Sequence, residues 1–188
     1  MTSSLYLDGK ILLAMPNMAD TRFDRSVIYV CSHDESGAMG IVINDSFDNL
    51  TFSDLLDQLD IEIEGSEIPD LVMHSGGPVE PGRGFVLHSA DYVQESTLVV
   101  SECLALTATV DILRAIAHGV GPHHHILALG YAGWGAGQLE KEIQENSWLT
   151  SEADDEIIFN TELEQKWPRT MAMLGINISM LSSESGHA

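Results

Sequence analysis

Positive charge is scarce in this chain. Only 8 lysine and arginine residues stand against 29 aspartate and glutamate residues among 188, giving a formal net charge of −21. Nucleic-acid binding depends on lysine and arginine side chains that neutralise phosphates and release counterions. Eight cations spread along the chain form no basic stripe, so we expect no direct contact with DNA or RNA. The same negative field disfavours an anionic membrane surface and favours a basic partner.

Cysteine and long apolar runs are scarce as well. The two cysteines, Cys31 and Cys103, are far apart and suggest no disulfide framework, and no C-x-x-C motif is present for zinc or redox chemistry. The apolar run at residues 11–16 is too short for a signal-peptide core or a membrane span. We therefore expect a cytoplasmic protein that is not attached to a membrane.

The length and the apolar content predict an ordinary globular protein. With 188 residues, 44% of them hydrophobic, the chain fits one domain over residues 1–188, with room for a small lobe around residues 45–70. Runs rich in Ile, Val and Tyr predict strands mainly in the first half, and periodic apolar residues predict helices mainly in the second half. This order favours an α+β fold built on a mixed sheet.

The local patterns place individual elements. A turn at residues 33–37 joins two strands into a hairpin. A capping box at Thr51 begins a helix that ends near Leu59, and a second helix is expected from Thr107 to Gly119. Strands are expected at residues 10–15, 26–31, 38–44, 71–74, 84–88, 98–100, 104–106, 126–131 and 176–181, with 71–74 paired to 84–88. Further helices are expected over residues 138–146 and around Trp167, Met171 and Leu174, which share one buried face and end at Gly175.

A glycine-rich segment, GYAGWGAGQLE at residues 130–140, follows the expected strand 126–131. The order strand, glycines, helix is that of a dinucleotide site, but the third glycine of the G-x-G-x-x-G pattern is missing, and Glu140 places negative charge where a pyrophosphate would bind. We therefore predict a turn that presents Trp134, as an anchor for a ligand or partner or as a lid over the core.

Several motifs in this chain, in this order, resemble those of the YqgE/AlgH family along nearly the whole length. The matching segments are LAMPNMAD (13–20), FDRSVIYVCSH (23–33), GAMGIVIN (37–44), GGPV (76–79), RGFVLH (83–88), DIL (111–113), ALGYAGW (128–134), GQLE (137–140) and GHA (186–188). The resemblance implies a complex α/β-type domain with a curved, bifurcated mixed β-sheet that forms a pseudo-barrel flanked by helices. It also implies a regulatory label, since the family is often described as regulators of transcription.

The chain departs from the family pattern at three places. Asp45 and Ser46 stand where a basic residue and a proline are usual, and the segment from Thr107 to Asp111 lacks the usual cation. Both departures weaken any anion site there. Pro168 interrupts a helix that is otherwise continuous, which predicts either a kink or a helix that starts with Pro168 at its first position.

Three groups of residues are candidates for chemistry. Cys31 and His33 lie two residues apart on a strand, so that both face the same way; this suits either an activated thiolate, with Asn44 as the orienting residue, or a buried cysteine beside a turn histidine. Gly76, Gly77 and Arg83 suit either an anion-binding turn or a structural turn whose arginine pairs with an acid. The histidines at 123–125 lack a third ligand, so we expect no metal and no cofactor.

Two hypotheses follow. The first is a regulatory or accessory protein that acts indirectly, through an unknown protein partner or a small-molecule ligand, since no complete catalytic set is present. The second is a small-molecule-binding domain or an enzyme. The candidate ligand or partner surface comprises Cys31, His33, Asn44, Gly76, Gly77, Arg83, His88, Trp134 and Gln138.

Overall fold

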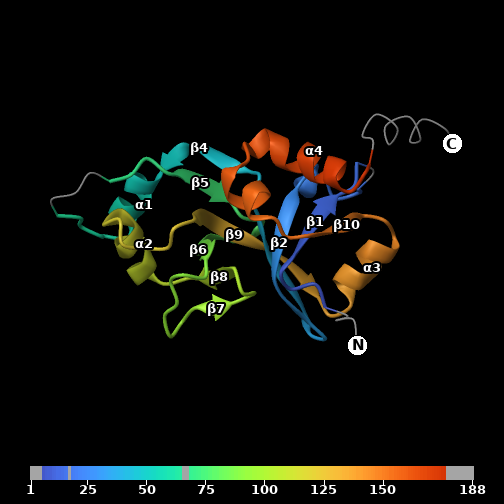
Figure 1. Cartoon of the computed structure of the whole chain (residues 1–188), viewed down its shortest axis with the longest axis horizontal. Coiled ribbons are helices and arrows are strands. Elements are labelled where there is room, and N and C mark those ends of the chain that lie inside the picture. The colour runs from blue at the N-terminus through green and yellow to red at the C-terminus, as the bar shows by residue number, and fades with distance from the viewer. Residues whose placement is uncertain (1–5, 17, 65–67, 177–188) are drawn as a thin grey trace. The chain divides into compact units, whose positions relative to one another are not determined.

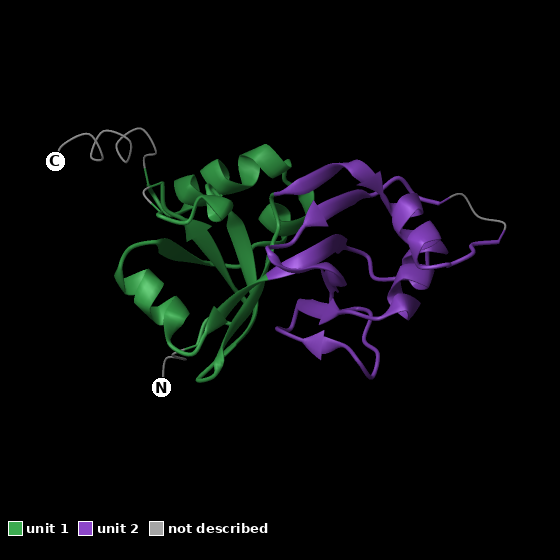
Figure 2. Cartoon of the chain, turned by 180° about the vertical axis from the view of Figure 1, so that it is seen from behind, with its two compact units in different colours: residues 1–44, 132–188 green, residues 45–131 purple. Residues whose placement is uncertain are grey.

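The computed structural model describes residues 6–16, 18–64 and 68–176, which fall into two compact units (Figure 2). Unit 1 comprises residues 1–44 and 132–188, and unit 2 comprises residues 45–131. Residues 45–70, where a small lobe is expected, lie within unit 2, and the number of domains stays a prediction. The strand β9 (His125–Gly135) belongs to unit 2 up to Tyr131 and to unit 1 from Ala132 onward.

Unit 1 is a strongly curled antiparallel sheet with helices (Figures 1 and 2). Its strands are β1 (Lys10–Ala14), β2 (Val27–Asp34), β3 (Gly37–Val42), the end of β9 and β10 (Trp148–Glu152), paired in the order β10-β1-β2-β3-β9. The predicted hairpin is confirmed, with Asp34 opposite Gly37. Its helical segments are η1 (Thr21–Phe23), α3 (Gln138–Gln144), the π-helix η2 (Glu156–Asn160) and α4 (Leu163–Met173).

The core of unit 1 forms where apolar strand residues meet the indole rings. Leu12, Ile28 and Val30 pack with Trp134 and Trp148, whose ring centroids are 5.8 Å apart in an edge-on arrangement. The Trp167 indole N–H of α4 donates to the Ala14 carbonyl at 2.9 Å, which fixes this helix to β1.

Two expectations for the end of the chain change, and a third falls almost wholly outside the described residues. Pro168 lies inside α4, which begins at Leu163, so the helix that starts at Pro168 is wrong and the kink stays a prediction. Leu174 is 39% exposed rather than buried, because α4 ends at Met173 and Leu174 is its C-cap. Of the strand expected over residues 176–181, only Ile176 lies within the described residues.

Unit 2 gathers strands around β9 (Figure 1). Its elements are β4 (Ser46–Thr51), α1 (Phe52–Gln58), β5 (Val72–Ser75), β6 (Val79–Ser89), β7 (Leu98–Val99), β8 (Leu104–Thr107) and α2 (Val110–Ala117). The expected pairing of residues 71–74 with 84–88 is wrong, because β9 pairs with both strands: β5 runs parallel to it and β6 antiparallel. Along its length β9 therefore changes neighbours, with β5 at residues 127–129 and β3 at residues 132–135.

Two helices cover the core of unit 2, and only the first begins with a side-chain cap. The capping box at Thr51 is confirmed: Asp54 N–H donates to the Thr51 hydroxyl at 3.1 Å, and Thr51 N–H donates to the Asp54 carboxylate at 3.0 Å. The other helix begins at Val110 rather than at Thr107, because Thr107 is the last residue of β8. Phe52, Leu56 and Ile112 are fully buried in this core.

The predicted α+β class, with a curved and bifurcated mixed sheet flanked by helices, is confirmed. The glycine-rich turn is the main correction, because β9 continues through it to Gly135 and pairs Gly133 with Met39 and Trp134 with Ala38. Glycine in β3 permits this approach: a Cβ on Gly37 would lie 2.3 Å from the Trp134 carbonyl oxygen.

Candidate functional site

Cys31 is enclosed by unit 1. Its side chain is buried, and its sulfur lies 3.8 Å from the Tyr29 carbonyl oxygen. Burial raises the pKa of the Cys31 thiol to about 12. Because the thiolate is the nucleophilic form, this cysteine is a small apolar core residue at neutral pH rather than an activated nucleophile.

His33 is held by two fixed partners. The Leu7 backbone N–H donates to His33 Nδ1 at 3.0 Å, and His33 Nε2 lies 2.6 Å from Glu140 Oε1. Since Nδ1 accepts a hydrogen bond, the proton of the neutral ring is on Nε2, which donates to the Glu140 carboxylate. Both ring nitrogens therefore join segments of unit 1, and neither presents a free lone pair for a general base.

The side-chain amides of Asn44 and Gln138 form hydrogen bonds with backbone groups. The Asn44 side chain accepts from Val27 N–H at 2.9 Å and donates to the Arg25 carbonyl at 2.8 Å, which closes the entry to β2. Gln138 accepts from Gly135 N–H at 2.9 Å, at the start of α3. Both amides therefore replace missing backbone hydrogen bonds at strand and helix ends.

Trp134 is a core residue. It is 7% exposed and packs with Trp148 inside unit 1. Of the two alternatives for this indole, its position resembles the lid over the core more than the exposed anchor. The glycines around it continue the strand instead of forming a loop.

The segment with Gly76, Gly77 and Arg83 belongs to unit 2. A Cβ on Gly76 would lie 2.3 Å from the Gly130 carbonyl oxygen, and one on Gly130 would lie 2.3 Å from the Gly77 carbonyl oxygen. These glycines therefore allow two backbone segments to touch. The Arg83 guanidinium lies 3.4 Å from the Glu80 carboxylate and 5.1 Å from the centre of the Phe85 ring, as expected for an arginine that pairs with a nearby acid.

His88 ends a chain of hydrogen bonds that sequence reasoning missed. Its Nδ1 lies 2.8 Å from the Ser89 carbonyl, so Nδ1 carries the proton and Nε2 accepts from the Thr107 hydroxyl, also at 2.8 Å. The Thr107 hydroxyl in turn lies 2.9 Å from the Thr97 hydroxyl, which accepts from Gln94 N–H at 3.0 Å. Burial lowers the pKa of His88, so the neutral ring is the stable form near neutral pH.

The nine candidate residues fall into both units. Cys31, His33, Asn44, Trp134 and Gln138 belong to unit 1, and Gly76, Gly77, Arg83 and His88 belong to unit 2. Their role as one ligand or partner surface stays a prediction. Within the described ranges, no group of three or more His, Cys, Asp or Glu side chains is placed to hold a metal ion. In the same part of the chain, no helix is long and apolar enough to cross a membrane.

Unit 2 contains an apolar pocket between its two helices and its sheet. It encloses about 550 Å³ of space, part of it open to solvent. Uncharged residues line it, namely Leu55 of α1 and its C-cap Leu59, Met73 of β5, Gly82, Gly84, Phe85 and Val86 of β6, Thr107 of β8, Ala108 and Thr109, Val110 and Leu113 of α2, and Leu127, Ala128 and Leu129 of β9. The one sequence signal for it is the pair of glycines at residues 82 and 84 inside a strand.

Comparison with known proteins decides the family. The model of the family described as AlgH-like (DUF179) matches residues 11–179. The chain belongs to the AlgH-like family. This match confirms the resemblance to the YqgE/AlgH family. Bacterial relatives match the chain over 97% to 100% of its length.

Two relatives illustrate the similarity within the AlgH-like family. A UPF0301 protein of Rhodopseudomonas palustris strain HaA2 is 54% identical over 97% of this chain and 87% of its own length. UPF0301 protein blr1492 of Bradyrhizobium diazoefficiens is 52% identical over 100% of this chain and 91% of its own.

Two solved structures resemble this AlgH-like fold. The solution structure of the AlgH protein from Pseudomonas aeruginosa is 42% identical, with a TM-score of 0.78 over 100% of this chain and 99% of its own. Protein DIP2367 from Corynebacterium diphtheriae is 20% identical, with a TM-score of 0.72 over 92% of this chain and 90% of its own, and supports the fold alone.

Proposed function

We propose that this AlgH-like protein is a non-catalytic regulatory or accessory protein that acts by binding a small ligand or a protein partner. One observation carries the proposal: Cys31, His33 and His88, the candidate residues able to act as nucleophile or base, are committed to internal contacts. Cys31 is buried with a raised pKa, and His33 and His88 use both ring nitrogens in fixed hydrogen bonds. A site that needs a free nucleophile or base has none among these three.

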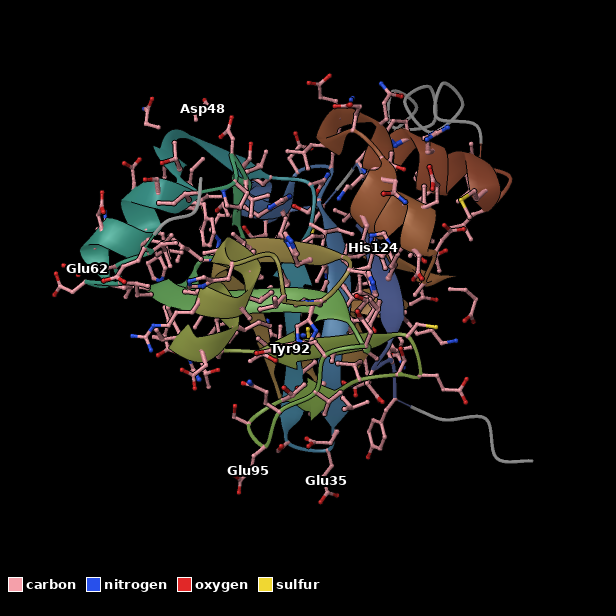
Figure 3. The ribbon with its side chains drawn as sticks, turned by 60° about the vertical axis from the view of Figure 1, so that its left-hand side comes forward. Glu35, Asp48, Glu62, Tyr92, Glu95 and His124 are labelled. Carbon is pink, nitrogen blue, oxygen red and sulfur yellow. The ribbon has the colours of Figure 1, made fainter. Side chains whose placement is uncertain are left out.

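Charge supports an indirect effect on transcription. Unit 2 carries 14 acidic residues against two arginines, a net charge of −12, and Unit 1 carries 15 acidic residues against six lysines and arginines, a net charge of −9. Figure 3 labels Glu35, Asp48, Glu62 and Glu95, all exposed and directed away from the ribbon. Such a surface repels phosphate backbones and favours a basic protein or a neutral ligand.

The alternative is a small-molecule-binding domain or an enzyme. The apolar pocket of unit 2 favours its binding part, because concave and mostly apolar sites are typical of ligand pockets. Its catalytic part would need Cys31 as a reactive thiolate, which the burial of that thiol opposes.

Alkylation with iodoacetamide tests the non-catalytic proposal. The chain has an internal control in Cys103, which is exposed. At pH 8 the native protein should be modified at Cys103 alone, and Cys31 should react only after unfolding in urea, as mass spectrometry of the peptides would report. Rapid modification of Cys31 in the native protein would overturn the proposal and support the enzyme alternative.

A further inference from the structure

Two glycines of β6 leave the pocket of unit 2 hollow. Gly84 is paired with Leu129 and Val86 with Leu127, so these four residues share one face of the sheet, on which Val86 and Leu127 are buried and Gly84 is exposed. A Cβ on Gly84 would meet only the Leu129 side chain, at 3.8 Å, and one on Gly82 would meet no described atom within 4 Å.

The backbone does not require glycine at these two positions. Neither residue is among the glycines with a φ in the left-handed region, and no other backbone approaches them closely. Gly76 and Gly130 differ, since each would bring a Cβ to 2.3 Å from a carbonyl oxygen. Glycine inside a strand weakens it unless a bulge, a bend or a closely approaching ligand or backbone uses the space. The register of β6 against β9 shifts between Val79 and Gly84, and the positive φ of this irregularity falls on Glu80 rather than on either glycine. The open space beside Gly82 and Gly84 gives room for a ligand.

The pocket lining defines the chemistry of that ligand. Its walls are aliphatic, from Leu55, Leu113, Leu127 and Leu129, and no charged side chain is among the described residues that line it. A charged ligand would be buried there without a partner, which is costly. Asp111, next to the lining residue Val110, is paired with Arg114 at 3.7 Å, so this pair supplies no net positive charge to hold an anion.

One polar atom in the lining lacks a partner. The Thr109 hydroxyl oxygen is buried and forms no hydrogen bond within the described structure, and Thr109 caps α2 without a side-chain cap bond. The other hydroxyl of the lining, that of Thr107, is already used by His88 and Thr97. A buried hydroxyl without a partner costs free energy, which a ligand with one polar group would recover.

We propose that the pocket between α1, α2 and the sheet of unit 2 binds a neutral aliphatic molecule with a single hydroxyl or carbonyl group. The chain of the ligand occupies the space left by Gly82 and Gly84, and its polar group forms a hydrogen bond with Thr109. This inference deepens the proposed function and rests on it, since it names the class of ligand through which a binding protein acts.

A series of 1-alkanols from butanol to octanol tests the pocket, with octanoate as the charged counterpart. Binding is followed by NMR on the ¹⁵N-labelled full chain, through the amide signals of Gly84, Thr109 and Leu113. Affinity should rise roughly fourfold for each methylene that enters the pocket. Octanoate should bind roughly tenfold or more weakly than octanol. Absence of shifts at these amides with every alkanol would overturn the inference, as would equal affinity for octanoate.

Matched variants locate the site. Gly84→Leu fills the space and should abolish binding, whereas Gly135→Leu makes the same change in unit 1, where only the Gln138 side chain lies near, and should leave binding unchanged. Thr109→Val keeps the shape and should weaken alkanol binding about fivefold. Unchanged binding in both Gly84→Leu and Thr109→Val would overturn the site, and the valine variant keeps the test valid if the leucine variant does not fold.

Failure of this inference and failure of the proposed function give different results. If no alkanol binds while Cys31 resists alkylation, the pocket is wrong and the non-catalytic proposal stands. If an alkanol binds at these amides and native Cys31 reacts rapidly, the pocket stands and the non-catalytic proposal is wrong.

Discussion

Lys166 shows how one buried residue can link the stability of unit 1 to pH. Its side chain is 2% exposed, and its ammonium donates to the Ile43 carbonyl at 2.9 Å and to the Ile158 carbonyl at 2.7 Å. Those bonds connect α4 to the π-helix η2 and to Ile43, the residue after β3. Burial nevertheless lowers the pKa of Lys166 to about 8, because the charged form loses its hydration.

The lowered pKa predicts that stability rises with pH. Above pH 8 the folded protein releases the Lys166 proton while the unfolded chain, with a pKa of 10.5, still keeps it. The free energy of unfolding of the wild type, relative to Lys166→Met, should therefore increase by about 1 kcal/mol from pH 7 to pH 9. Urea unfolding at both pH values measures this.

The comparison with Lys166→Met removes contributions that both proteins share. Among them is Cys31, whose raised pKa acts in the opposite direction, with stability present below the pKa of the unfolded thiol and lost as pH rises above it. A difference between wild type and variant that does not change with pH would contradict the prediction and mean that Lys166 keeps its charge.

At the scale of elements, two helices of unit 2 begin at a threonine but are capped differently. Thr51 completes a reciprocal capping box with Asp54, whereas Thr109 forms no side-chain cap bond. The first pattern is legible in the sequence, because a capping box involves residues only three positions apart. The start of α2 cannot be read from the sequence in this way. Thr107 is the last residue of β8, so the helix begins only at Val110.

The pair provides a matched test of capping. Thr51→Ala should lower the free energy of unfolding by about 1 kcal/mol, since the Asp54 backbone N–H loses its acceptor at the start of α1. Thr109→Ala removes the same atoms without removing a cap bond, so it should cost less than half as much. Chemical denaturation of both variants checks this, and equal losses would show that capping does not set the stability of α1.

At the scale of the whole molecule, the charge of −21 predicts no affinity for nucleic acid. A fluorescently labelled DNA duplex should show no change in anisotropy with micromolar protein at about 50 mM salt, where phosphate contacts are strongest. Binding that weakens as salt increases to about 200 mM would contradict the prediction. It would also contradict an indirect role in transcription.

Sequence reasoning came closest where the signal is local. The strands at residues 10–15 and 104–106, the hairpin and the capping box were all predicted, because each depends on neighbouring side chains. Trp134 was placed on a turn because glycines usually interrupt strands, yet here they allow β3 and β9 to approach. The pairing of β5 and β6 with β9 depends on residues distant in sequence, and no local pattern records it.

The predictions about function and the candidate site divide in the same way, into those that the sequence supports by itself and those that need the tertiary structure. Composition alone argued against nucleic acid, because charge is additive and does not depend on the fold. The family and the α+β class followed from ordered motifs and from strand and helix periodicity. Only the tertiary structure decided that Cys31 is buried, that His88 joins Thr107, and that Gly82 and Gly84 line a hollow. Burial, tautomer and cavity arise from long-range packing, which the linear order of residues does not specify.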